Sequence, residues 1–402
     1  MKTKILVSVS AFACALAFLV VVLGAFTRLA DAGLGCPDWP TCYGHLWVPT
    51  SSHDIATANE AFSETPVETH KTWPEQLHRI FASSLGFVIL IIFIVLSRAR
   101  ARDTKQRALN SVALLLIALV CGTIGRIVFG EVIEPFLWAL ILVYFGNLIR
   151  LARLSGKAEN QHTIPYFLGA SLAGLVILQG LFGMWTVILK LWPQVVTAHL
   201  LGGFTTLSLL FLLSLRLGYA GTLKLKVGLN PALAGYSSIA IVVVGLQIAL
   251  GGWTSSNYAA LACSDFPYCQ GSWLPTMDFI HGFNFFQDIG PNYLGGNLNN
   301  EGRTAIHFSH RIGAILASIA VITYLVKGFL CPHSDTLLKR ANALVVVLLI
   351  TQVALGIANI KLLLPLANAV AHNAVAALLL LSLIYSKYLV HRQLATSTRD
   401  TL

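Results

Sequence analysis

The chain has few charged residues. Asp, Glu, Lys and Arg make up only 11% of its 402 residues, whereas soluble domains contain roughly 25%. Hydrophobic residues account for 56%, and the mean hydropathy is +0.74. This shortage of charge excludes an ordinary soluble domain and predicts an all-α polytopic membrane protein embedded in a lipid bilayer. The net charge of +10 then requires no nucleic acid partner, because excess Lys and Arg is typical of cytoplasmic loops.

The sequence also lacks the Arg-rich, Ser-rich opening of an organelle transit peptide. It begins Met-Lys-Thr-Lys and continues with an apolar run, for which a cleaved signal peptide is the alternative interpretation. That run ends at Gly24-Ala25-Phe26, which matches Gly251-Gly252-Trp253 later in the chain. The first segment therefore belongs to a repeated unit, and we expect it to be retained in the plasma (inner) membrane of a bacterium.

Ten stretches are apolar enough to cross a bilayer, for which roughly 20 residues are needed. Their approximate ranges are 5–29, 75–97, 108–128, 133–152, 164–189, 194–217, 232–254, 305–327, 340–361 and 367–389. With the N-terminus inside, 19 of the 27 Lys and Arg residues fall on the inner side, and 13 of the 17 acidic residues fall on the outer side. Because Lys and Arg concentrate in cytoplasmic loops, this distribution predicts that both termini are cytoplasmic.

The two halves of the chain carry the same distinctive residues in the same order, including ionisable ones that are energetically costly inside a bilayer. The first half has Cys36 and Cys42, His78-Arg79, Gln179, Gly183 and His199, and the second has Cys263 and Cys269, His310-Arg311, Gln352, Gly356 and His372. The offset is 227 for the cysteines, 232 for the His-Arg pair and 173 for the rest. Shared hydrophobicity alone would not keep such constant offsets. We therefore predict a parallel repeat, related by an axis along the membrane normal.

The repeat predicts two pseudo-symmetric four-helix transmembrane bundles, one in residues 1–225 and one in residues 226–402. From His78 to His199 the chain runs 121 residues, but from His310 to His372 only 62. The excess of 59 is about the length of residues 98–155, which hold two of the predicted spans. We therefore expect an inserted helical hairpin there, and long outer loops over residues 30–74 and 255–304.

Four histidines lie inside predicted spans. With a rise of 1.5 Å per residue, His78, His199, His310 and His372 all fall about 6 to 10 Å from the outer ends of their helices. Pairs of neutral imidazoles without cysteine or carboxylate partners favour haem iron over zinc, which takes four ligands. We predict that His78 pairs with His199 and His310 with His372. A structural hydrogen-bonding role is the alternative for any single histidine, and His307 is a rival to His310.

Three charged residues lie beside the predicted ligands. Arg79 and Arg311 directly follow two of the histidines and can either pair with haem propionates or extend to lipid headgroups. Glu75 precedes His78 by one helical turn, where the second half has His307. Its carboxylate can move protons or stabilise developing charge; the alternative is a helix N-terminal glutamate that meets the helix dipole and Arg79. This asymmetry favours Glu75 as a catalytic residue and an electron-transfer or structural second half.

Two cysteine pairs share the spacing Cys-x5-Cys on the outer, oxidising side, which predicts the local disulfides Cys36–Cys42 and Cys263–Cys269. Each disulfide acts either as a structural staple, which we favour, or as a redox relay to a nearby centre. The remaining cysteines are predicted to be free thiols: Cys14, Cys121 and Cys331.

Taken together, these residues resemble the haem A synthase family, and the resemblance covers nearly the whole chain. It is carried by Thr27-Arg28-Leu29, Cys36-Pro37-Asp38-Trp39-Pro40 with Cys42, Glu75-x-x-His78-Arg79, Gly183-Met184-Trp185-Thr186-Val187 and the four helix histidines. The resemblance implies an enzyme that oxidises the C8 methyl of haem O, through successive hydroxylations, to the formyl group of haem A for cytochrome oxidase.

The resemblance also implies a division of roles between the halves. His78 and His199 would flank haem O as substrate, while His310 and His372 would ligate a permanent haem b. Glu75 would be the functional carboxylate of the first half. A haem O synthase and cytochrome oxidase assembly factors would be partners, and the motifs do not identify the electron donor. The alternatives are a quinol-linked dihaem electron-transfer cytochrome and a haem transporter or chaperone.

Overall fold

A computed structural model describes residues 2–98, 165–218, 229–285 and 292–397. Over these ranges the chain is helical and contains no β-strand beyond two isolated bridges. The helices are α1 (Lys2–Leu29), α2 (Ser52–Ala61), α3 (Thr69–Arg98), α6 (Tyr166–Ile188), α7 (Pro193–Gly218), α8 (Ala232–Ser256), α9 (Phe279–Gly282), α10 (Asn300–Leu330), α11 (Thr336–Lys361) and α12 (Leu366–Ser397).

Eight of these helices are long and apolar enough to span a bilayer, counted over the described ranges only. They coincide with eight of the ten predicted spans, whereas the predicted hairpin at 108–128 and 133–152 lies outside the described residues. Large apolar side chains are exposed along them, for example Ile319, Val347 and Ile350, which are more than half exposed. Such surfaces are stable only against lipid. The all-α polytopic membrane fold is confirmed; the count of ten spans and the cytoplasmic termini stay predictions.

The helices differ from the predicted spans mainly at their starts. Helix α3 begins at Thr69 rather than near 75, so Pro74 lies inside it. Helix α10 begins at Asn300, where the Asn299 side chain accepts a hydrogen bond from the backbone N–H of Gly302. Hydrophobicity predicts where a helix enters lipid, but capping residues set where it begins, and both helices have a polar first turn. His78 and His310 therefore lie further along their helices than predicted.

Two short helices in the long loops were not predicted. Helix α2 begins with a capping box in which Ser51 and Asp54 exchange side-chain and backbone hydrogen bonds. Helix α9 is capped by Asp278, which accepts from the N–H of His281. Helix α2 is too polar and helix α9 too short to produce a periodic apolar signal, so only their caps mark them in the sequence.

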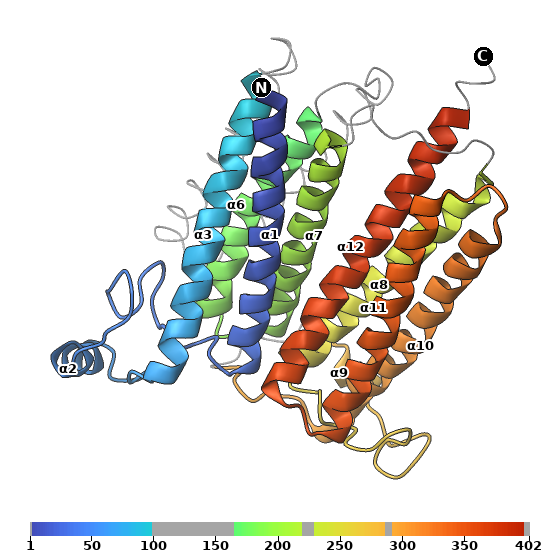
Figure 1. Ribbon diagram of the computed structural model, residues 1–402. Helices are drawn as coiled ribbons and strands as arrows, with labels where there is room; N and C mark the ends of the chain where they lie inside the picture. The colour runs from blue at the N-terminus through green and yellow to red at the C-terminus, as the bar shows by residue number, and fades with distance from the viewer. Residues whose placement is uncertain (1, 99–164, 219–228, 286–291, 398–402) are drawn as a thin grey trace. The chain divides into compact units, whose positions relative to one another are not determined.

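The contacts divide the described residues into two compact units, one drawn from the ranges 1–16, 83–180 and 209–223 and the other from 17–82, 181–208 and 224–402. This division does not follow the repeat, so the predicted halves 1–225 and 226–402 stay a prediction. In the second unit, α8 packs against α10 and α12, and α11 packs against α10 and α12. These four helices run side by side in Figure 1.

Glycines lie at helix contacts that join α6 to α3 and α7 to α1. In the first unit, Gly169 of α6 lies against Leu96 of α3, and Gly218 of α7 lies against Val7 of α1. In the second unit, Gly203 of α7 faces Val21 of α1. Small residues let helix backbones approach closely where lipid supplies no hydrophobic driving force, so these contacts are typical of membrane helices.

Unusual backbone conformations also recur at equivalent positions of the repeat. Left-handed residues occur at equivalent positions at the end of α1 and α8 (Asp31 and Tyr258) and in the turns after α6 and α11 (Lys190 and Leu363). The peptide bonds before Pro40 and Pro267 are both cis. The offsets of 227 and 173 predicted from the motifs therefore hold in the turns as well. This agreement supports a true duplication.

Candidate functional site

The structure brings His78 and His199 together. Their rings come from α3 and α7, with centroids 6.4 Å apart and planes at 86°. Two imidazoles that bind one metal from opposite sides have centroids about 6 Å apart, because each metal–nitrogen bond is about 2 Å. Both side chains are half-buried, and Nδ1 of His78 has no hydrogen-bond partner. This spacing fits the predicted pair of haem ligands.

Each of the four predicted ligands packs against a glycine of a neighbouring helix. A Cβ atom at Gly24 would lie 2.9 Å from Cε1 of His78, and one at Gly183 would lie 3.4 Å from Cε1 of His199. These contacts are closer than the 3.5–4.0 Å optimum between carbon atoms. Only glycine therefore leaves the His78 ring in its present position.

The second half repeats this arrangement. A Cβ atom at Gly251 or Gly356 would lie 3.2 Å from Cε1 of His310 or His372, respectively. The two histidines lie close enough to interact electrostatically, and both are half-buried. The glycines occupy repeat-equivalent positions, 24 and 251 and also 183 and 356. We interpret them as cradles that seat the rings, a role that sequence reasoning missed although it noted all four glycines as repeat markers.

Glu75 lies in a buried network at the end of α3 that meets the first disulfide loop. One carboxylate oxygen accepts from the backbone N–H of Cys36 at 2.9 Å, and the other accepts from Arg79 at 2.5 Å. The side chain is 6% exposed. Arg79 also donates to the carbonyls of Asp38 and Thr41 at 2.8 and 2.7 Å. Glu75 therefore connects the predicted His78 site to the loop above it.

The second half places His307 where the first half has Glu75, as the sequence predicted. The backbone N–H of Cys263 donates to Nδ1 of His307 at 3.3 Å, as that of Cys36 does to Glu75. Arg311 donates to the carbonyls of Cys263, Asp265 and Tyr268 at 2.7 to 2.8 Å. His307 is thus engaged with the loop, which leaves His310 as the ligand candidate. The pairing of Arg79 and Arg311 with haem propionates stays a prediction.

Both predicted disulfides are present, Cys36–Cys42 and Cys263–Cys269. Cys14 and Cys331 are free as expected, while Cys121 lies outside the described residues. The cysteine pairs at equivalent positions close equivalent Cys-x5-Cys loops, each with a sequence separation of six. In each, an isolated bridge joins the second cysteine to the residue three positions later.

An aspartate inside each disulfide loop organises its turn. Asp38 accepts from the backbone N–H groups of Tyr43 and Gly44 and from the hydroxyl of Thr41, and Asp265 accepts from the equivalent N–H groups. Burial acts to raise the pKa of the Asp38 carboxyl, but these hydrogen bonds outweigh it and hold the pKa below its usual range. Each loop is therefore stabilised by hydrogen bonds to an aspartate within it and by hydrogen bonds from an arginine of the following long helix.

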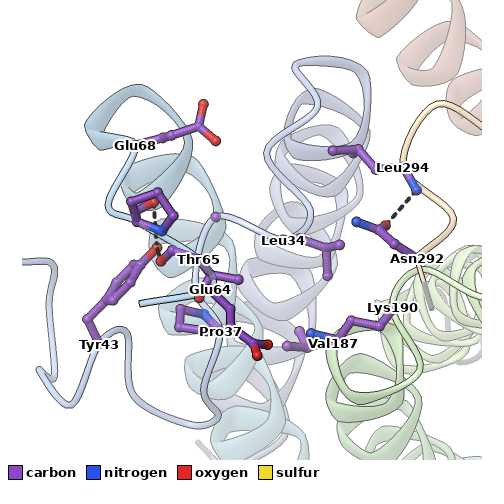
Figure 2. A pocket seen from close by; sticks show the side chains of 12 residues that line it. Leu34, Pro37, Tyr43, Glu64, Thr65, Glu68, Val187, Lys190, Asn292 and Leu294 are labelled. Carbon is purple, nitrogen blue, oxygen red and sulfur yellow. Dashed lines mark hydrogen bonds between the residues drawn. The ribbon is translucent and has the colours of Figure 1, made fainter. Parts of the chain in front are cut away.

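A pocket of about 320 Å³ lies beside the first disulfide loop. Figure 2 shows the Tyr43 hydroxyl directed at the 65–66 segment, where it donates to the carbonyl of Thr65 at 3.0 Å. Burial and nearby carboxylates raise the pKa of Tyr43 to about 12, so this hydroxyl stays protonated. Glu64 and Lys190 both extend toward Val187 in the same view. None of the predicted histidine ligands lines this pocket, so it belongs to the loop region.

The fold and the site together define a class: a polytopic helical membrane protein with paired histidines on its long helices and two disulfide-closed loops. The chain matches the COX15-CtaA family, described as cytochrome oxidase assembly protein, over residues 8–132 and 123–384. It therefore belongs to this family.

Similar proteins span almost the full length of the chain. A "Heme A synthase" from Shewanella oneidensis is 36% identical over 94% of this chain and 95% of its own length. Relatives with the same name from Nitrosospira multiformis and Halalkalibacterium halodurans are 26% and 23% identical, each over 94% of this chain and over 92% and 94% of their own lengths. The similarity thus includes both halves and both disulfide loops.

Proposed function

We propose that this chain is a haem A synthase, an oxidoreductase that converts the C8 methyl of haem O to the formyl group of haem A for cytochrome oxidase assembly. The observation that carries the proposal is the close pair of His78 and His199, with ring centroids 6.4 Å apart and with His78 on a helix that also carries a buried carboxylate the other half lacks. Near-full-length relatives named for this activity support it.

The first half is proposed to hold the substrate. His78 and His199 flank haem O, and the glycines behind them keep the rings in position. Glu75 lies three residues from His78 on the same helix and is the proposed catalytic residue, because a buried carboxylate can accept a proton or stabilise positive charge near the methyl that is oxidised. Its bond to the Cys36 N–H also couples it to the loop that covers this end of the bundle.

The second half is proposed to hold a permanent haem b. His310 and His372 would hold it, and their glycine cradles match those of the first pair. Bound haem b supplies one-electron redox chemistry. The residues of this half position the ring nitrogens and exclude water. Arg79 and Arg311 are proposed to meet propionates at the loop end, in addition to the loop carbonyls to which they donate.

We further propose that the protein lies in the bacterial inner membrane with both haem sites toward the outer side. The disulfides support this orientation, because they persist in oxidising compartments. The proposed partners are the enzyme that supplies haem O and the assembly factors that receive haem A.

The test is to express the chain in a bacterial host that makes haem O but no haem A, and to identify extracted haems by chromatography and mass. Haem A should appear with the wild-type chain and be absent with a His78→Ala, His199→Ala double variant. Unchanged haem O, in folded protein that still carries haem, would refute the synthase assignment and favour the dihaem electron-transfer cytochrome instead.

A further inference from the structure

Large apolar side chains are exposed just after each disulfide loop. Leu46 and Trp47 follow the first loop and are 87% and 42% exposed, and Trp273 and Leu274 follow the second and are 65% and 76% exposed. The two pairs are equivalent at the offset of 227, so each half has one leucine and one tryptophan at this point. Their order is reversed between the halves, which preserves the apolar character but not the shape that one specific protein partner would fit.

We call these two pairs the loop tips, and the folded loops fix them in place. The isolated bridge within each loop region ends immediately before its tip. In the first half, Nε2 of the buried Gln76 of α3 donates to the carbonyl of Leu46 at 2.7 Å. In the second half, the ring of Trp273 contacts that of Tyr268, with centroids 4.7 Å apart. The exposure of the tips therefore belongs to the ordered loop.

The arginine contacts place both loops at the level where the apolar outer surface of their helices begins. Arg79 and Arg311 donate to backbone carbonyls of the first and the second disulfide loop, respectively. The next residues along the two helices, Ile80 and Ile312, are 41% and 44% exposed, and Ile315 is 56% exposed. On a membrane-spanning helix such side chains face lipid. Each loop thus lies beside its helix near the boundary between water and hydrocarbon.

The sequence around each tip carries no full charge. Residues 39–53 and 266–277 contain no Asp, Glu, Lys or Arg, whereas acidic residues follow directly at Asp54 and Asp278. A segment without charges can enter the headgroup region without burying an ion. Tryptophan and tyrosine are enriched at this interface, where their rings lie at headgroup level. Position and composition therefore favour lipid as the partner of both tips.

We propose that the tips Leu46-Trp47 and Trp273-Leu274 insert into the headgroup region of the adjacent leaflet and anchor the two disulfide loops to the membrane surface. The loops, and not only the helices, then contact the bilayer. The first cysteine of each loop donates its backbone N–H to Glu75 or His307. Lipid contact at the tips therefore also holds the loops that bond to these two residues.

The experiment follows single tryptophans of the full-length protein in nanodiscs of phosphatidylcholine and phosphatidylglycerol. Trp47→Phe and Trp273→Phe each remove one of the eight tryptophans, so the emission of the wild type minus that of the variant belongs to the residue removed. Lipids brominated on the acyl chain near the headgroup quench tryptophans in the bilayer, and iodide quenches those in water. Trp253→Phe is the matched control, because Trp253 is 3% exposed and donates to the Gly282 carbonyl.

We expect brominated lipid to remove most of the Trp47 and Trp273 emission, and iodide to leave it nearly unchanged. The Trp253 emission should be protected from iodide and quenched less by the lipid. Quenching of Trp47 and Trp273 by iodide but not by brominated lipid would overturn the proposal, because the tips would then lie in water. Protection from both quenchers would also overturn it, and would indicate that protein covers the tips.

A second pair of variants keeps both tryptophans in place. Leu46→Ser and Leu274→Ser each make one tip less apolar, so the neighbouring tryptophan should become more accessible to iodide and less quenched by brominated lipid. Unchanged quenching in both serine variants would refute insertion of the tips as leucine–tryptophan pairs. The melting temperature of each variant, measured in the same nanodiscs, distinguishes a moved tip from an unfolded protein.

Discussion

Replacing the glycine behind His78 tests whether the glycine cradles set the ligand geometry. In Gly24→Ala the new Cβ would lie 2.9 Å from Cε1 of His78, against an optimal carbon–carbon separation of about 3.5–4.0 Å. The ring or the helix must therefore move by roughly 0.5–1 Å. A displacement of about 1 Å at a reacting centre can reduce the rate by about 100-fold.

Two further substitutions complete a graded series. Gly183→Ala places a Cβ 3.4 Å from Cε1 of His199, and Gly180→Ala, on the same helix, meets nothing within 4 Å. Alanine in place of helical glycine is by itself favourable by about 1 kcal/mol, so none of the three should unfold the protein through its helix propensity. The expected order of haem A formation is Gly180→Ala equal to wild type, Gly183→Ala lower, and Gly24→Ala lowest.

The assay combines the ratio of haem A to haem O in host membranes with the haem content and melting temperature of the purified protein. A loss of conversion at an unchanged melting temperature would indicate a displaced ligand rather than a damaged fold. Full activity and normal haem content in Gly24→Ala would refute the idea that the glycine positions the His78 ring. An equal loss in Gly180→Ala would refute it too, since that position contacts no ligand.

Three further predictions concern the first half and its contact with α8. Glu75→Ala and Glu75→Gln should both retain haem but lower haem A formation by about 100-fold or more; full activity of the glutamine variant, which still accepts from the loop N–H, would exclude a catalytic carboxylate. The folded state lowers the pKa of Asp38, so the ionised carboxylate stabilises the folded protein above about pH 4. That stabilisation is lost as the pH falls through the folded-state pKa. The melting temperature should therefore fall at acid pH in the wild type, and fall less in Asp38→Asn. Arg28 donates to the Ser255 carbonyl at 2.6 Å and lies 4.1 Å from the centre of the Tyr258 ring. These contacts should stabilise the folded protein by about 1–3 kcal/mol, so Arg28→Ala should have a lower melting temperature. An unchanged melting temperature would show that the contacts contribute little.

The predictions from sequence succeeded where a strong physical constraint leaves a periodic or repeated mark. Lipid requires long apolar helices, so eight spans could be read from composition. Two cysteines six positions apart in one loop are close enough to pair, so both disulfides were predicted correctly. The facing of His78 and His199 followed from duplication and depth, although their shared depth was misjudged because α3 begins earlier than its apolar run.

Contacts to backbone atoms and empty space could not be predicted. Arg79 and Arg311 donate to backbone carbonyls of the loops. Every residue has such a carbonyl, so the sequence does not indicate which ones accept. Gly24 is needed for the room that its missing side chain leaves, which becomes visible only once a ring lies against it. The repeated glycines were available as a signal, but a glycine in a membrane helix is more often a helix contact.

The proposed duplication accounts for two different sites in one chain. Both halves keep the elements that position a histidine pair: a glycine behind each ring, an arginine beneath each loop and an aspartate within it. They differ in the side chain that accepts from the first cysteine of the loop, Glu75 against His307. On the proposed function, a scaffold that fixes ligand geometry twice allows these two side chains to give the two sites different roles. Exchanging them between the halves should therefore alter haem content or haem A formation before it alters folding.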